Sequence, residues 1–435
     1  MAKSTTDKIG LWTCTSLVVG NMIGSGVFLL PSTLAAYGGI SIVGWLFSSL
    51  GAFILAVLFS YLSRAMPSVG GPYAYTREGL GEFAAFLVAW GYWISTWCGN
   101  AAITVAFVSY LSVFFPVLSA EPLVAVLTGL SAIWLLTWVN SRGVALAGRV
   151  QLVTTVLKLL PLLLIALFGF FYIDWQLFIP FNRSTESNLS AIGSTATLTL
   201  WAYLGMESAT VPAGNVENPE KTIPRATLLG TAIAACVYIF GTVAVMGLIP
   251  VEMLKNSAAP FANTAAKIWG ESARLWVAFG AMVSTFGALN GWILMQGQIP
   301  LAMTKDKLFP SVFGKENSKG VPALGIVISS ILLSVLMSMN FSKTLVEQFK
   351  FMILLSTLTV LIPYLFSSAS FILILKKQNI VSAKERTIKL TLAFLAFAYS
   401  LWAVAGSGQE VVYWGFILLM LGVPVFIFMK YKSKG

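Results

Sequence analysis

Small and polar residues interrupt the first long apolar run of the chain. The stretch VVGNMIGSGVFLLP, residues 18–31, places Asn21, Gly24, Ser25 and Gly26 where a membrane helix would be continuous. Each glycine inside a helix costs about 1 kcal/mol relative to alanine, and hydrocarbon cannot hydrogen-bond a freed backbone. Small residues can also serve only to bring two helices close together. If the helix is broken instead, the N–H groups that start its second half could bind a carboxylate.

A second apolar run carries the same kind of interruption. The stretch TLTLWAYLGMESATVPAG, residues 197–214, contains Gly205 and Glu207. Backbone carbonyls of the two interruptions, near Met22 and Leu204, would suit an ammonium group. Interrupted helices in corresponding positions of two halves are a sequence sign of an inverted-repeat transporter. Together the two interruptions predict one site for an α-amino acid.

The elements that would position this site are membrane helices. The 435-residue chain is 57% hydrophobic and only 10% charged, and the alternation typical of a membrane β-barrel is absent. Twelve apolar runs are each long enough to cross a bilayer. They cover residues 11–35, 41–64, 84–115, 122–141, 147–174, 191–213, 226–249, 275–301, 321–340, 351–375, 387–406 and 410–430.

Charged and metal-binding residues narrow the possible functions. The net charge of +11 reflects lysines and arginines that concentrate in alternate loops, which predicts that both termini are cytoplasmic. No basic face of a folded domain indicates nucleic-acid binding. The chain has no histidine, and its three cysteines lie within apolar runs, so we expect no metal site and no cofactor. Neither a nucleophile–base pair nor a metal cluster is evident, so we expect no enzyme. The lack of a phosphate-binding loop argues against an ATP-driven pump.

Several motifs together resemble a known family. GNMIGSGVFLLP, GGPYAY (70–75), YWISTWCGN (92–100), LWAYLGMESATVPAGNVENPEKTIPRAT (200–227) and LIPYLFS (361–367) are similar to the basic amino acid/polyamine antiporter family of the amino acid–polyamine–organocation superfamily. The resemblance covers essentially the whole chain. It implies a single all-α transporter domain over residues 1–435, with helices one and six broken. Two inverted repeats of five helices would cover residues 11–174 and 191–375, and two further helices residues 387–430.

The resemblance also implies roles for individual residues. Asn21, Met22, Ser25 and Gly26 match positions that hold the substrate carboxylate and amine, and Trp201 and Leu204 match the wall of helix six. The substrate side chain would meet Trp292, Asn100, Ser95, Thr96 and Ser356. Tyr92, Glu207 and Tyr364 match an outer gate, and Tyr73 matches a position linked to cytoplasmic gating and pH response.

Some positions depart from the arginine exchangers of this family. Ser95 and Thr96 replace smaller or less polar side chains, Ile103 replaces a methionine and Ala288 a serine. Because of these changes, the sequence does not decide whether the site accepts the guanidinium group of arginine or another head group. Glu207 is the one acidic residue deep in the apolar runs, either as a proton-sensitive gate residue or as a neutral carboxyl bonded to a neighbouring helix. The indole of Trp292 could stack on a cation or belong to ordinary packing.

Lys158 is the one basic residue deep in an apolar run. It resembles the helix-five lysine of sodium-independent amino acid transporters of the superfamily, where the ammonium occupies the place of a sodium ion. Alternatively, it snorkels to the cytoplasmic interface. We therefore assign proton coupling to Lys158 and Glu207 as a hypothesis.

These patterns predict a secondary transporter in a bacterial inner membrane. We expect alternating access that exchanges an external, basic amino acid for an internal amine or amino acid, with the lipid bilayer and small amines as partners. Proton-coupled, sodium-independent uptake is the alternative, and a non-transporting amino acid sensor is a third interpretation. No nucleic acid partner is expected, and a homodimer is left open.

Overall fold

The protein folds into a bundle of helices. The computed structural model describes residues 10–24, 26–66, 71–142, 162–207, 216–377 and 382–433, and the regular elements in these ranges are helical. Eight helices are long and apolar enough to cross a membrane, and the bent pair α1 and α2 would make a ninth span. Two shorter apolar helices, Leu162–Tyr172 and Ala323–Met339, add to these. The prediction of an all-α protein with many membrane helices is thus confirmed.

The first half of the chain begins with a bend of 41° between α1 and α2. Gly71 and Gly81 precede α4 and α5 and have φ values of 50° and 86°. Because glycine adopts such positive φ values readily, the chain can change direction before each of these helices. The helices of this half are α1 (Leu11–Met22), α2 (Gly26–Ala35), α3 (Ile40–Ala65), α4 (Pro72–Leu80), α5 (Glu82–Leu111), α6 (Val117–Ala120) and α7 (Pro122–Ser141).

The second half contains the longest helices. Its helices are α9 (Asn188–Leu200), α10 (Pro219–Leu248), α11 (Val251–Leu254), α12 (Pro260–Trp269), α13 (Glu271–Lys305), α14 (Ala323–Met339), α15 (Leu345–Lys377), α16 (Ala383–Gly406), α17 (Gln409–Met420) and α18 (Gly422–Ser433).

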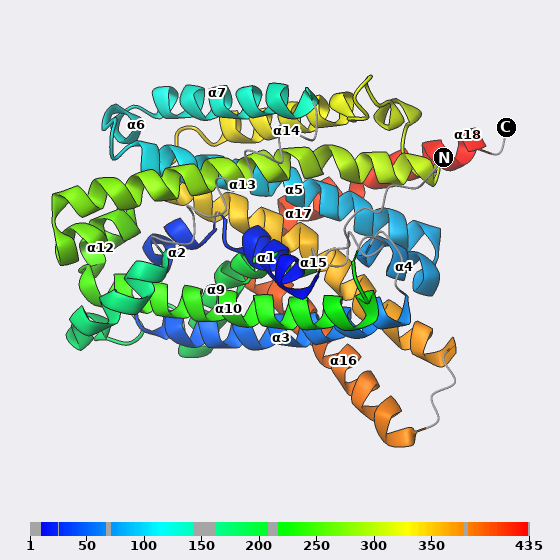
Figure 1. The fold of residues 1–435 in the computed structure, drawn as a ribbon, viewed down its shortest axis with the longest axis horizontal. Coiled ribbons are helices and arrows are strands. Elements are labelled where there is room, and N and C mark those ends of the chain that lie inside the picture. Colours follow the sequence, from blue (N-terminus) through cyan, green and yellow to red (C-terminus); the bar gives the residue numbers. More distant parts are fainter. Residues whose placement is uncertain are drawn as a thin grey trace.

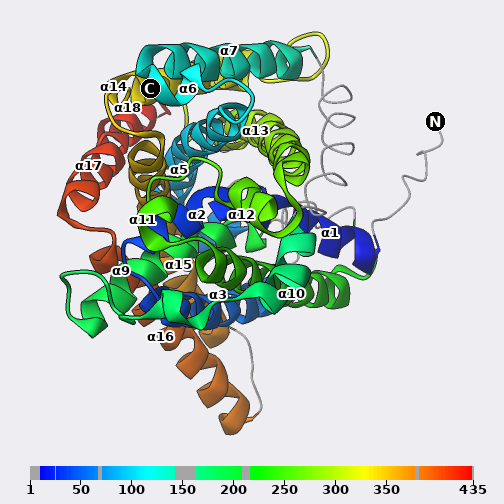
Figure 2. The same cartoon turned by 90° about the vertical axis from the view of Figure 1, so that its left-hand side faces the viewer.

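Helix α5 lies at the centre of the bundle. It packs against α13 and α15, while α3 packs against α9 and α10 on another side. In its most apolar 18-residue window, 89% of the residues of α5 are buried. Helices α7 and α14 lie together along one side of the molecule, and α16 projects from the opposite side (Figures 1 and 2). The polar side chains of α5 are therefore directed towards the protein interior and not towards lipid.

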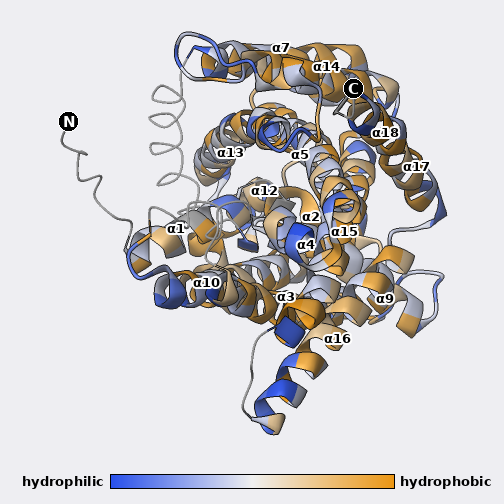
Figure 3. Ribbon diagram, turned by 90° about the vertical axis from the view of Figure 1, so that its right-hand side faces the viewer, coloured by the Kyte–Doolittle hydropathy of each residue, from blue (hydrophilic) through white to orange (hydrophobic). Residues whose placement is uncertain are grey.

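The outer helices carry the surface that a bilayer would cover. Leu123, Leu127, Leu135 and Trp138 of α7 are all more than half exposed, which is typical of lipid contact. Figure 3 shows hydrophobic residues over α7, α14 and α17, and hydrophilic residues at the projecting end of α16. The projecting end of α16 thus carries the charged residues that suit water.

A helix ends at each of the two predicted interruptions. Helix α1 ends at Met22, and α9 ends at Leu200 and continues as a 3₁₀ turn, Trp201–Tyr203. Gly205 has a φ of 96°, a conformation that favours glycine. The carbonyl of Ala202 accepts a hydrogen bond of 3.0 Å from the hydroxyl of Tyr238, so α10 satisfies one backbone group of the second break.

The two breaks lie against each other. A side chain at Gly205 would begin 3.4 Å from the Cβ atom of Asn21, which is the last residue but one of α1. The first break also touches α13, because a Cβ at Gly24 would lie only 2.9 Å from the Cβ of Ala288. The breaks therefore bring backbone from both halves of the chain to one point beside α13.

Candidate functional site

One face of α5 forms the wall of a cavity. Tyr92, Thr96, Gly99 and Ile103 follow one another at intervals of three or four residues, and Ser95 lies next to Thr96. All five therefore fall on one side of a helix with 3.6 residues per turn. All five line a small cavity at the two helix breaks. The remaining walls come from Asn21, Met22, Trp201, Leu204, Gly205, Glu207, Trp292, Ser356 and Val360.

The structure brings together most of the residues that the sequence analysis selected. Ten of them line this central cavity: Asn21, Met22, Tyr92, Ser95, Thr96, Trp201, Leu204, Glu207, Trp292 and Ser356. They come from both halves of the chain. The cavity therefore combines two indoles, four hydroxyl-bearing side chains and one carboxyl group in a small, mostly apolar space.

Hydroxyl groups on α5 and α15 face each other in the cavity wall. The hydroxyl of Ser356 donates to the carbonyl of Ser95 at 2.8 Å, and the two serine Oγ atoms lie 3.0 Å apart. The hydroxyl of Thr96 donates to the carbonyl of Tyr92 at 2.7 Å. Because these hydrogens are directed to the backbone, lone pairs of the hydroxyl oxygens of Thr96 and Ser356 can accept from a cationic donor.

Asn100 lies outside the cavity wall. Its side chain is fully buried and its amide donates to Oε1 of Gln296 on α13 at 2.8 Å. Gln296 in turn donates to Ser330 on α14 at 2.8 Å. The geometry places Asn100 in a polar contact that joins three helices, rather than against a substrate side chain as we expected. Its neighbour Gly99 occupies the cavity wall instead.

Two tyrosines hold the carboxyl group of Glu207. The Tyr92 hydroxyl donates to Oε1 at 2.9 Å, and the Tyr364 hydroxyl donates to Oε2 at 3.0 Å. Glu207 and Tyr364 are almost completely buried. Since each carboxyl oxygen receives one phenol, the carboxyl plane is oriented from both α5 and α15. This arrangement ties the second break to two continuous helices.

This group of three residues lies on the same side of the cavity as Tyr73. Along α5, Tyr92 precedes the other cavity residues on the side of Glu82, and along α15, Tyr364 follows Ser356 towards Lys377. We expected an outer gate at the end opposite Tyr73. The structure corrects this expectation, because Tyr92 and Glu207 separate the central cavity from a second cavity that reaches Tyr73.

The second cavity is larger and mainly apolar. It lies between α4, α5 and α13. Its walls include Tyr73, Met295, Ile299, Met303 and Lys305, in addition to Tyr92 and Glu207. Tyr92 and Glu207 are therefore the wall that the two cavities share.

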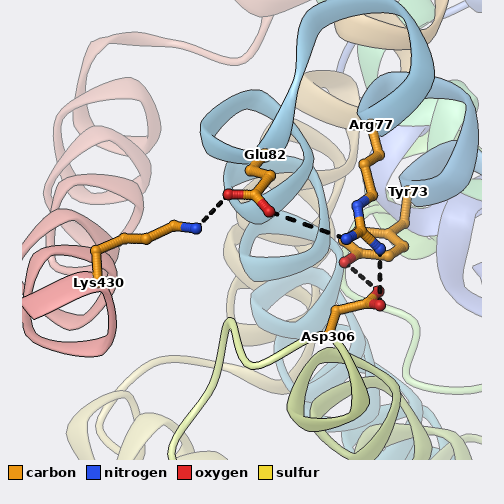
Figure 4. A network of polar contacts seen from close by, with 5 residues as sticks. All are labelled: Tyr73, Arg77, Glu82, Asp306 and Lys430. Atoms are coloured by element: carbon orange, nitrogen blue, oxygen red, sulfur yellow. Dashed lines mark hydrogen bonds and ion pairs between the residues drawn. The ribbon is translucent and has the colours of Figure 1, made fainter. Parts of the chain in front are cut away.

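Tyr73, a wall residue of the second cavity, belongs to a network of charged side chains. The Tyr73 hydroxyl donates to Oδ2 of Asp306 at 2.5 Å, and Nη1 of Arg77 lies 2.7 Å from Oδ1 of the same carboxylate. Figure 4 shows the three side chains converging, with Glu82 between Arg77 and Lys430. Burial and the hydrogen bond to Asp306 raise the pKa of the Tyr73 hydroxyl above its ordinary value. This phenol therefore stays a donor at physiological pH.

Two predicted residues lie outside the described residues. Ser25 and Lys158 fall there, so their roles stay predictions. Gly26 is the first residue of α2, which is the position expected for a helix N-terminus that meets a carboxylate.

The sequence analysis missed two kinds of residue. Gly99 and Val360 line the cavity, and their spacing of four residues from Ser95 and Ser356 could have indicated them. The contact between Arg77 and Asp306 joins residues more than 200 positions apart. In the sequence only their opposite charges, in two loops between apolar runs, pointed to it.

Comparison with known proteins places the chain among transporters. The Amino acid permease family model matches residues 9–428. The chain is 37% identical to the cadaverine/lysine antiporter of Escherichia coli K12, over 77% of this chain and 75% of that protein. It is 34% identical to the putrescine transporter PotE of Haemophilus influenzae, over 98% of each chain, and 30% identical to PotE of Escherichia coli K12, over 97% and 96%.

Proposed function

Because this chain belongs to the amino acid permease family, and is a membrane transporter rather than an enzyme, we propose that it exchanges a basic amino acid for an amine. The names of its relatives specify lysine, cadaverine and putrescine. Lysine and its decarboxylated amine share one alkyl chain and one ammonium end. One cavity can therefore accept both in turn, which is what exchange by alternating access requires.

The observation that carries this proposal is the central cavity at the two helix breaks. Asn21 and Met22 end one helix there, and Leu204 and Gly205 follow the end of another. Backbone groups at such ends bind charged parts of small ligands. In this proposal, Ser25 and the first N–H groups of α2 hold the substrate carboxylate, while carbonyls beside Met22 and Leu204 accept from its ammonium group.

The rest of the cavity suits a cationic side chain. An ammonium over a desolvated indole gains about 2 kcal/mol, and both Trp201 and Trp292 line the space. The hydroxyl oxygens of Thr96 and Ser356 offer acceptors beside the indoles. We propose that these four side chains bind the alkylammonium end of the substrate.

Glu207 and its tyrosines would form the gate towards the Tyr73 end. Opening this side requires Tyr92 or Tyr364 to release the carboxyl group, because the hydrogen bonds connect α5, α15 and the second break. A cationic substrate that approaches Glu207 would replace a phenol donor by an ammonium donor. We propose that substrate arrival thereby loosens the gate, and that Glu207 together with Lys158 responds to protons.

The finer architecture is also a proposal. We propose twelve membrane crossings in two inverted repeats of five helices with two further helices, both termini in the cytoplasm. The break at the start of each half and the basic loops support it. The network around Tyr73 would then face the cytoplasm. A homodimer stays a prediction.

Reconstitution into proteoliposomes tests the proposed function. We expect radiolabelled lysine to enter vesicles that contain cadaverine and to stay out of empty vesicles. Uptake into empty vesicles that a pH gradient drives would support the proton-coupled alternative. Binding without uptake under either condition would support the sensor interpretation.

A further inference from the structure

Gly99 lies where the central cavity meets the indole of Trp201. A Cβ atom at this position would lie 2.8 Å from Cη2 and 3.3 Å from Cζ3 of that indole, and 3.3 Å from Oγ of Ser356. Carbon atoms in contact normally lie about 3.5–4.0 Å apart. The missing side chain of Gly99 therefore leaves a notch in α5 that the six-membered ring of Trp201 occupies.

A second glycine of the same helix shows a different kind of contact. A Cβ at Gly91 would lie 2.8 Å from the carbonyl oxygen of Thr359, in the backbone of α15. Gly91 therefore serves the close approach of two helices, which is the common reason for glycine in membrane helices. Gly99 differs because it faces side chains and lines the cavity.

We propose that Gly99 determines which substrate chain length the cavity accepts. This inference rests on the proposed function of the same cavity. With glycine at this position, Trp201 lies against α5 and leaves the space beside Trp292 and Ser356 to the substrate. Any larger residue fills part of that space with its own atoms or pushes the indole into it.

The expected effect follows from the size of one methyl group. Adding a methyl group to the wall removes about the room that one methylene of the substrate needs. One methylene in an apolar pocket changes discrimination by about 10–200-fold. Substitution by alanine should therefore disfavour lysine relative to ornithine, which is one methylene shorter, and cadaverine relative to putrescine.

Competition binding to purified protein provides the measurement. Displacement of radiolabelled lysine by unlabelled lysine, ornithine, cadaverine and putrescine gives the affinity ratio within each pair of probes. We expect G99A to lower the lysine/ornithine affinity ratio by about tenfold or more, and the cadaverine/putrescine ratio in the same direction.

The matched control is G422A. Its new Cβ would also meet a tryptophan, at 2.8 Å from Cδ1 of Trp90, but neither residue lines the central cavity. We expect this variant to leave both ratios unchanged. If G99A leaves the ratios unchanged as well, or if G422A changes them equally, the inference is wrong.

The opposite change at the other side of the notch covers the case in which G99A does not fold. W201F removes the ring atoms that approach Gly99, so it should shift the same ratios towards the longer member of each pair. An unchanged or opposite shift would overturn the inference. If the wild type binds none of the four probes, the proposed function fails instead, which separates the two results.

Discussion

Two carboxyl groups of this protein each accept a tyrosine hydroxyl, but their surroundings differ. Glu207 is 1% exposed and receives the phenols of Tyr92 and Tyr364, which are neutral. The side chain of Asp306 is 29% exposed and receives the phenol of Tyr73 together with the guanidinium of Arg77. Hydrogen bonds thus orient Glu207 beside the cavity, whereas an ion pair compensates the charge of Asp306 at the end of the molecule.

The largest expected effect separates these two carboxyl groups. E207Q keeps the size of the side chain but leaves one acceptor oxygen for two donating phenols, so we expect exchange of lysine for cadaverine to fall by about 100-fold or more. The matched change D306N should reduce exchange by less than about tenfold, because water reaches this site. Rates in proteoliposomes with equal protein content give the comparison. Equal losses in the two variants would show that burial does not distinguish them.

Removal of the Tyr92 or Tyr364 hydroxyl, which holds Glu207, should have the next largest effect on the exchange rate. A hydrogen bond to a charged group contributes about 1.5–3 kcal/mol, so Y92F and Y364F should each slow exchange by roughly 10–100-fold. Because both phenols hold one carboxyl group, the double variant should lose less than the product of the single losses. Initial exchange rates of the three variants measure this coupling. Independent, multiplicative losses would contradict a shared role.

The ion pair between Arg77 and Asp306 should have a smaller effect on the exchange rate, and this effect should depend on the salt concentration. Partly exposed ion pairs contribute about 0–1 kcal/mol, so R77Q should change exchange by roughly fivefold at most. Raising the salt concentration should reduce the difference between wild type and variant, since ions screen the pair. The check is exchange at low and high ionic strength. A loss as large as that of E207Q would make this network part of the substrate path.

The smallest effect concerns pH. The raised pKa of Tyr73 keeps its hydroxyl protonated up to alkaline pH, and its donated hydrogen bond is lost only as pH rises through that raised value. Y73F should therefore lower the exchange rate several-fold but leave the midpoint of the pH profile between pH 5 and 8 in place. Exchange rates across this range measure it. A shifted midpoint would show that Tyr73 itself takes part in the pH response.

Local patterns in the sequence were enough to predict the cavity at the helix breaks. Gly24 and Gly205 stand out in apolar runs, and the periodicity of α5 places Ser95, Thr96 and Ile103 on one face. The cavity at the helix breaks follows from such local signals. Asn100 shares the helix but lies about 100° around it from Gly99, which turns it towards Gln296.

Other features depend on packing between distant segments. The side of the cavity on which Glu207 lies was predicted incorrectly. Only the packing of α5 and α15 shows that Tyr92 and Tyr364 lie between the central cavity and the end of the molecule that carries Tyr73. The notch at Gly99 depends on the position of the Trp201 ring, and the Arg77–Asp306 pair depends on how α4 meets the end of α13. No local pattern in the sequence contains these relations.

A structure determined with bound lysine would show whether the cavity at the helix breaks is the substrate site. We expect lysine in the central cavity, with its α-carboxylate at the start of α2, its α-ammonium beside Met22 and Leu204, and its side chain between Trp201 and Trp292. Cadaverine should occupy the same space when it replaces lysine. Lysine bound in the cavity around Met295 and Met303, with the central cavity empty, would contradict the account.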